Sequence, residues 1–154
     1  VTSCINASEY LSTILGVDRS PAPYLNLEME GKVHEGVRTA IKRGCIQSAH
    51  DVADGGLFVT LLEMGMPRGL GFDIVTDDEI RLDAFLFGEG QGRIVVSCTE
   101  IQQDTFLDVI EEFDLPVILL GHVTKGKIEV DAKPFGFCAE WRNTYDNALA
   151  EELA

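Results

Sequence analysis

Two short glycine-containing segments carry the residue types in this sequence that are best suited to chemistry. The first reads HDVADGGL at residues 50–57, and the second reads FGEGQGR at residues 87–93. Adjacent glycines let the backbone turn sharply and approach a ligand, and a helix N-terminus offers free N–H donors to an anion. Both segments are therefore candidate ligand-binding loops.

The first segment lies where a strand is expected to lead into a helix. Asp51 and Asp54 would repel a bare phosphate unless Mg²⁺ lay between them. His50 could act as a general base near neutral pH, although a lone histidine without a visible partner is more often structural. The alternative is a tight turn into a helix capped by Asp54, and the residues alone favour this structural interpretation.

The second segment precedes an apolar strand, whereas a dinucleotide-binding loop needs G-x-G-x-x-G between a strand and a helix, so that class is excluded. Glu89, Gln91 and Arg93 alternate, so in an extended segment all three would project from one side and could bind a polar ligand, with Arg93 available to a phosphate. A solvated turn with an ion pair is the alternative, and the spacing does not decide between them. The candidate nucleotide- or substrate-binding residues are Asp51, Asp54, Gly55, Gly56, Glu89, Gln91 and Arg93. No catalytic residue and no metal-ligand set is assigned.

Several helices are expected around these segments. Apolar residues recur every four positions in one stretch, which predicts a one-sided helix that stops at Gly44; they are Met29, Val33, Val37 and Ile41. A short helix over residues 8–15 precedes it, separated by a loop at residues 21–24. Further helices are expected at residues 57–62 and 81–87, and behind a capping box formed by Thr99 and Gln102, with an apolar face of Phe106, Val109, Ile110 and Phe113. A final helix starts at about Cys138 and presents Trp141, Tyr145 and Leu149 on one side.

Strands are expected between the helices, over residues 45–52, 72–75, 93–98, 116–120 and 127–130, and the third of these should be buried. Strands that alternate with helices indicate an α/β protein with helices packed on a mixed sheet. The 154 residues fit a single domain, with residues 1–24 as an entry helix and linker and residues 25–154 as the core.

Composition excludes several classes of protein. The 26 acidic and 12 basic residues leave a net charge of -14, which disfavours nucleic acid and anionic membranes as partners. Cys4, Cys45, Cys98 and Cys138 show no paired spacing, so we expect reduced thiols and neither a zinc site nor a disulfide. No long apolar run or secretory signal is present, so we expect a cytoplasmic protein. Because the chain starts with Val1, inside what reads as structured sequence, we also expect it to be part of a longer polypeptide.

Taken together, the two segments resemble the paired signature of the C-terminal domain shared by the aminoimidazole ribonucleotide synthetase superfamily. Three further stretches resemble the second half of the phosphoribosylformylglycinamidine synthase family; they read SEYL at residues 8–11, PYLNLE at 23–28 and WRNTY at 141–145. The resemblance covers nearly the whole chain. It implies a three-layer fold, a mixed sheet flanked by helices, with partly ferredoxin-like topology.

The resemblance also implies a function. The family's enzyme is an ATP-dependent ligase of purine biosynthesis that converts formylglycinamide ribonucleotide and glutamine-derived ammonia to the amidine, with Mg²⁺. This chain would be a C-terminal subdomain of its non-catalytic half, with a structural role and no activity alone. Its partners would be the remaining synthetase subdomains and a glutaminase subunit or domain, and a homo-oligomer is compatible with the family. The small form of the enzyme would also need a bridging subunit.

The family's catalytic histidine and most of its ATP and metal ligands lie in other subdomains, so none is carried over to His50. Its substrate-binding Glu-Ser-Gln element corresponds to Glu89, Gly90 and Gln91, and Gly90 lacks the serine hydroxyl. Two alternatives stay open. One is a self-sufficient module in which Asp51, Asp54 and Arg93 hold Mg-ATP. The other is the same domain from aminoimidazole ribonucleotide synthetase, selenophosphate synthetase, a hydrogenase maturation factor or thiamine-monophosphate kinase.

Overall fold

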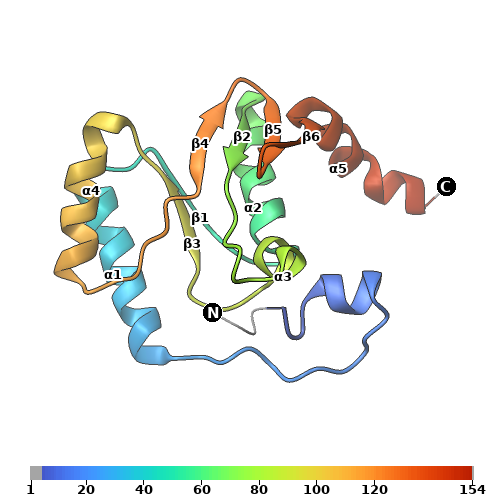
Figure 1. The fold of residues 1–154 in the computed structure, drawn as a ribbon, viewed down its shortest axis with the longest axis horizontal. Helices are drawn as coiled ribbons and strands as arrows, with labels where there is room; N and C mark the ends of the chain where they lie inside the picture. Colours follow the sequence, from blue (N-terminus) through green and yellow to red (C-terminus); the bar gives the residue numbers. More distant parts are fainter. Residues whose placement is uncertain (1–4, 154) are drawn as a thin grey trace.

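A computed structural model describes residues 5–153, in which helices and strands alternate along the chain (Figure 1). The helices are η1 (Tyr10–Ile14, a π-helix), α1 (Leu27–Arg43), α2 (Gly56–Gly65), η2 (Met66–Arg68, 3-10), α3 (Leu82–Phe87), α4 (Glu100–Glu112) and α5 (Cys138–Glu152). The strands are β1 (Ser48–Asp51), β2 (Gly71–Ile74), β3 (Ile94–Ser97), β4 (Gly121–Thr124), β5 (Lys127–Val130) and β6 (Lys133–Phe137). None of the described helices is long and apolar enough to span a membrane.

The strands form two sheets. β1 and β3 pair antiparallel, and the other four strands form a mixed sheet in the order β4-β2-β5-β6. In the mixed sheet β2 runs parallel to β5, and its other neighbour, β4, runs antiparallel to it. The α/β class with a mixed sheet flanked by helices is thus confirmed, with the strands divided between two sheets.

Two hydrophobic clusters lie on opposite faces of β3. Val95 packs against the larger cluster, which surrounds α2 and contains Phe58, Phe72 and Ile128. The next residue, Val96, packs against the smaller cluster between α1 and α4. Since side chains alternate along a strand, one short strand serves both cores. Its four residues are half-buried, so the expectation of a buried strand was wrong.

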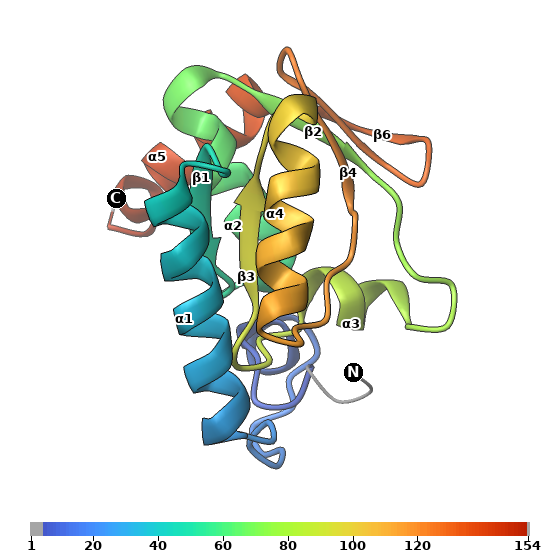
Figure 2. The same cartoon turned by 90° about the vertical axis from the view of Figure 1, so that its left-hand side faces the viewer.

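Helices α1 and α4 lie side by side, as Figure 2 shows. The predicted stop of α1 is confirmed, because Gly44 takes a left-handed φ of 66° at the C-cap. The buried positions of α1 are Gly36 and Ala40, whereas Ile41 is 58% exposed. A bidentate pair of Arg43 with Glu112, at 2.6 and 2.7 Å, joins the ends of the two helices.

The start of α4 also agrees with the sequence. Within the predicted capping box, the Thr99 N–H donates to Oε1 of Gln102 at 3.0 Å. The predicted apolar face of the helix is the one that enters the smaller cluster, with Phe106, Val109 and Ile110 buried. The amide of Gln102 also donates to the Gly44 carbonyl at 2.7 Å, so the same side chain ties α4 to the end of α1.

The C-terminal strands differ from expectation. Residues 116–120, predicted as a strand, have no regular structure, and β4 begins only at Gly121. Ile118 and Leu119 are 62% and 79% exposed, and within this apolar run only Leu120 packs against the larger cluster. β6 was not predicted, because Pro134 and Gly136 both disfavour a strand. Its place at the edge of the sheet is where proline is tolerated.

The hairpin between β5 and β6 turns through two residues with left-handed backbones, Asp131 (φ 51°) and Ala132 (φ 58°). Asp131 accepts hydrogen bonds from the N–H of Thr76 at 2.8 Å and from its hydroxyl at 2.7 Å. These bonds favour the ionised carboxylate, so they hold the pKa of Asp131 below its usual value. The turn is thereby fastened to the end of β2.

The predicted final helix is confirmed as α5, but only its first half reaches the core. The Trp141 ring meets Phe58 edge-on at 5.2 Å, and its Nε1 donates to the Phe135 carbonyl at 2.7 Å. Tyr145 and Leu149, which were expected on the same side, are 54% and 72% exposed. The second half of α5 projects away from the rest of the molecule (Figure 1).

Candidate functional site

The two glycine-containing segments meet in the fold and line one pocket of about 380 Å³. The described residues that line it are Ala7, Pro23, Asp51, Val52, Ala53, Asp54, Glu89 and Gln91. Four of these residues were predicted from the sequence, namely Asp51, Asp54, Glu89 and Gln91, and they come from both candidate segments. Sequence reasoning missed Ala7 and Pro23, which come from the N-terminal segment, here defined as residues 5–25.

The first segment turns tightly between β1 and α2. Gly55 and Gly56 both have positive φ angles, of 83° and 69°, which confirms the conformation expected of this turn. A Cβ on Gly56 would lie 2.7 Å from the backbone Cα of Phe87, so the absence of a side chain lets the turn touch the end of α3. These glycines bring the two candidate segments together.

Asp54 does not cap α2, as had been expected. The N-cap residue is Gly55, which has no side chain that could accept a hydrogen bond from the first turn of the helix. Asp54 is exposed in the preceding turn and lines the pocket. The left-handed conformation of Gly55 moves the start of the helix one residue past the position that the sequence pattern favoured.

Glu89 accepts two hydrogen bonds from backbone groups that lie far apart in the sequence. Its Oε1 accepts the N–H of Gly55 at 2.8 Å and the N–H of Glu9 at 3.0 Å. One carboxylate oxygen therefore joins the start of α2 to the N-terminal segment. The alternation of residues 89, 91 and 93 gave no indication of this arrangement, because both donors are backbone groups distant in sequence.

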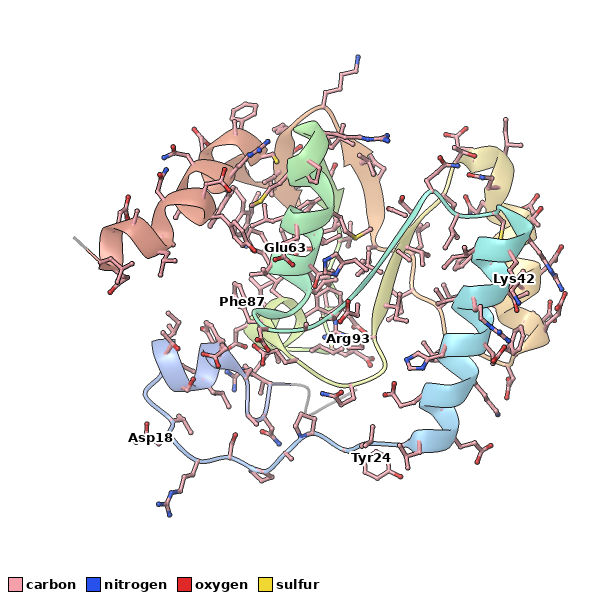
Figure 3. The ribbon with its side chains drawn as sticks, turned by 180° about the vertical axis from the view of Figure 1, so that it is seen from behind. Asp18, Tyr24, Lys42, Glu63, Phe87 and Arg93 are labelled. Carbon is pink, nitrogen blue, oxygen red and sulfur yellow. The ribbon has the colours of Figure 1, made fainter. Side chains whose placement is uncertain are left out.

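The three alternating residues do not converge in the pocket. Gln91 is exposed and lines it, whereas Arg93 is half-buried and is not part of the described lining. The Arg93 guanidinium donates to the Gly88 carbonyl at 2.9 Å, which folds the side chain back over its own loop. Figure 3 labels Arg93 beside the start of β3, near the centre of the molecule.

His50 has partners that the sequence did not reveal. Its Nδ1 lies 2.7 Å from the backbone carbonyl of Asp51, and its Nε2 lies 3.5 Å from a carboxylate oxygen of Glu63 on α2. The other oxygen of Glu63 accepts the Tyr145 hydroxyl at 2.8 Å, which raises the pKa of that tyrosine. The histidine thus belongs to a cluster that links β1, α2 and α5, which supports the structural interpretation.

The electrostatics of the pocket disfavour a bare anion. Three carboxylates line it, those of Asp51, Asp54 and Glu89, and no Lys or Arg is found among its described lining residues. Within residues 5–153, no group of three or more His, Cys, Asp or Glu side chains is placed to hold a metal ion. The residues present therefore do not fit Mg-ATP by themselves.

The N-terminal segment, which belongs to neither motif segment, supplies the remaining wall of the pocket through Ala7 and Pro23. Tyr10 stacks on Phe87 with ring centroids 4.9 Å apart and planes 9° from parallel. Beyond this contact the segment runs along the outside of the molecule through Asp18 to Tyr24, which Figure 3 labels. The segment reaches the pocket again at Pro23. The wall formed by Ala7 and Pro23 is therefore present only while the segment stays attached to the rest of the domain.

Comparisons with known proteins identify the family to which this chain is related. Residues 6–133 match the family "AIR synthase related protein, C-terminal domain". Relatives named phosphoribosylformylglycinamidine synthase subunit PurL include one from Deinococcus radiodurans, 34% identical over 84% of this chain, and one from Nostoc sp., 32% identical over 97% of it. The chain spans only 17% and 21% of the length of these two relatives.

Solved structures with the same fold come from Thermotoga maritima. PurL complexed with FGAR superposes with a TM-score of 0.69 at 14% identity, covering 85% of this chain and 24% of that one. The PurLQS structure gives a TM-score of 0.64 at 14% identity, covering 82% and 22%. The expected superfamily is thus confirmed by sequence and by fold: this chain belongs to the family of AIR synthase related C-terminal domains.

Proposed function

We propose that this chain is the C-terminal domain of an ATP-dependent phosphoribosylformylglycinamidine synthase and has a structural role within it. The whole enzyme would join ammonia, released from glutamine, to formylglycinamide ribonucleotide in purine biosynthesis. The observation that carries the proposal is the match along the chain to PurL subunits at 31–39% identity. The enzyme would act in the cytoplasm.

The site supports a structural role over a catalytic one. Glu89 is engaged with two backbone N–H groups, and His50 contacts Glu63 and a backbone carbonyl. Phosphoryl transfer needs cations at the phosphate, and the described lining of the pocket offers carboxylates instead. ATP and Mg²⁺ would therefore bind on other subdomains of the enzyme.

The proposed partners follow from the same relatives. They are called subunits, and one solved neighbour is titled PurLQS, so we expect further subunits, including a glutaminase, beside the remaining synthetase subdomains. A homo-oligomer is a further proposal. The net charge of -14 favours partner surfaces with basic residues.

A complementation experiment tests the structural role. A PurL polypeptide that lacks the matching domain would be co-expressed with this chain in a host that needs the enzyme to grow without added purines. We expect growth, and we expect a chain carrying Asp51→Ala and Asp54→Ala to restore it equally well. Growth with the wild-type chain but not with this double variant, if the variant is folded, would contradict the structural role.

Activity of the chain alone provides a second test. With formylglycinamide ribonucleotide, Mg-ATP and ammonia we expect no amidine above a no-enzyme control, because the described lining of the pocket contains three carboxylates and no Lys or Arg. The alternative, a self-sufficient Mg-ATP module built on Asp51, Asp54 and Arg93, predicts saturable heat on calorimetric titration with Mg-ATP. We expect none.

A further inference from the structure

The N-terminal segment is attached to the rest of the domain by few contacts. Among its described residues only Ser8 is fully buried, and apolar side chains such as Ile14 and Tyr24 are 65% and 82% exposed. A segment with so little buried apolar surface opens at low free-energy cost unless specific contacts hold it. Two such contacts are the stacking of Tyr10 on Phe87 and the hydrogen bond from Glu9 to Glu89.

The oxygen that receives Glu9 is the same one that receives Gly55. Gly55 is the N-cap of α2, and its N–H points where an anion would bind at the start of a helix. The chain's own carboxylate occupies that position at 2.8 Å. Because Oε1 accepts both N–H groups, the same carboxylate oxygen occupies the anion position and makes one of the two contacts that attach the segment.

We propose that Glu89 is a positioning residue, a carboxylate latch that fills the anion position at Gly55 and thereby holds the N-terminal segment closed over the pocket. With the latch closed, Ala7 and Pro23 form one wall of the pocket. A phosphate or carboxylate ligand could reach the Gly55 N–H only by displacing Glu89, and this would also release Glu9. A ligand at the Gly55 N–H and the hydrogen bond that Glu89 makes to Glu9 are therefore mutually exclusive, which leaves the segment held by the stacking of Tyr10 on Phe87. The inference does not depend on the proposed function.

Amide hydrogen exchange measured by NMR on the full chain tests the latch at single residues. In Glu89→Ala we expect the Glu9 and Gly55 amides to exchange about tenfold faster or more, because a hydrogen bond to a charged group typically contributes at least that factor to a local equilibrium. The amides of Phe72 and Ile128, in the core strands, should be unchanged and so report that the variant is folded. The Tyr10 ring signals should lose the shift caused by stacking on Phe87.

Two further variants separate the latch from simpler explanations. Glu89→Gln keeps an oxygen acceptor in the same place and should retain most of the protection. Asp54→Ala removes a carboxylate from the same pocket without removing either hydrogen bond, and it should leave the Glu9 and Gly55 amides as protected as in the wild type. Unchanged exchange in Glu89→Ala, or an equal acceleration in Asp54→Ala, would overturn the proposal.

Discussion

Replacing Gly56 by alanine tests whether the meeting of the two motif segments is a packing requirement. Gly56 has a φ of 69°, and a Cβ there would lie 2.7 Å from two backbone atoms of Phe87 and 2.8 Å from the Leu86 carbonyl oxygen. Backbone atoms cannot turn aside as a flexible side chain can. The start of α2 or the end of α3 must therefore move, although both elements contribute buried residues to the larger cluster.

The expected magnitude has two parts. A left-handed alanine costs about 1–2 kcal/mol, partly offset by about 0.4–1 kcal/mol because alanine restricts the unfolded chain. Forcing a methyl group into a packed contact adds about 1–3 kcal/mol. We therefore expect Gly56→Ala to lower the free energy of unfolding by about 1–4.5 kcal/mol.

Gly69→Ala is the matched control. Its φ is 62°, and apart from its own chain neighbours no heavy atom lies within 4 Å of the place that a methyl group would take. It should show the conformational cost alone, at most about 1.5 kcal/mol. Both free energies come from urea unfolding followed by circular dichroism. If Gly56→Ala is no more destabilising than Gly69→Ala, the close approach to Phe87 has no energetic consequence and the reasoning fails.

Three further predictions concern a cap, a turn and the thiols. Asp54→Ala should change the free energy of unfolding by less than about 0.5 kcal/mol, because Asp54 is exposed and Gly55 holds the cap position. A loss near about 1 kcal/mol in urea unfolding would indicate that Asp54 caps the helix after all. Asp131 has a lowered pKa, so the stability advantage of the wild type over Asp131→Asn should be full above about pH 4 and should vanish as the pH falls through the lower folded-state pKa. Unfolding at a series of pH values measures this, and an advantage that grows on acidification would contradict it. Thiol titration should find four thiols after unfolding. In the native chain the exposed Cys98 should react fast. Cys45 and Cys138 should react slowly because they are buried, and burial also raises the pKa of Cys138.

Local signals in the sequence predicted much of the fold. Gly44 ended α1 and the pair of Thr99 and Gln102 began α4, because helix ends depend on groups a few residues away. The strands were harder to place. The apolar run at residues 116–120 looks like a strand by composition. Its last residue, Leu120, accepts a hydrogen bond from the N–H of Val75, just after β2, and the strand that pairs with β2 is the following Gly121–Thr124. Pairing partners distant in sequence decide such boundaries.

The site could be predicted only as far as its two segments. Their glycines indicated sharp turns and close approach, and Gly56 against Phe87 is such an approach. The role of Glu89 was beyond reach, because its partners are backbone N–H groups of residues 9 and 55. For the same reason His50 looked isolated, since Glu63 comes near it only when α2 packs beside β1.

The parallel pairing of β2 with β5 has a consequence for the order of folding during synthesis. Phe72 and Ile74 leave the ribosome with α2, but their cross-strand neighbours Ile128 and Val130 follow only after α3, β3 and α4 have been made. At typical translation rates the delay is on the order of several seconds. During that interval the nascent chain exposes an apolar strand with an unpaired edge, which is the kind of surface that chaperones bind. The domain therefore completes its main core only when its last strands emerge.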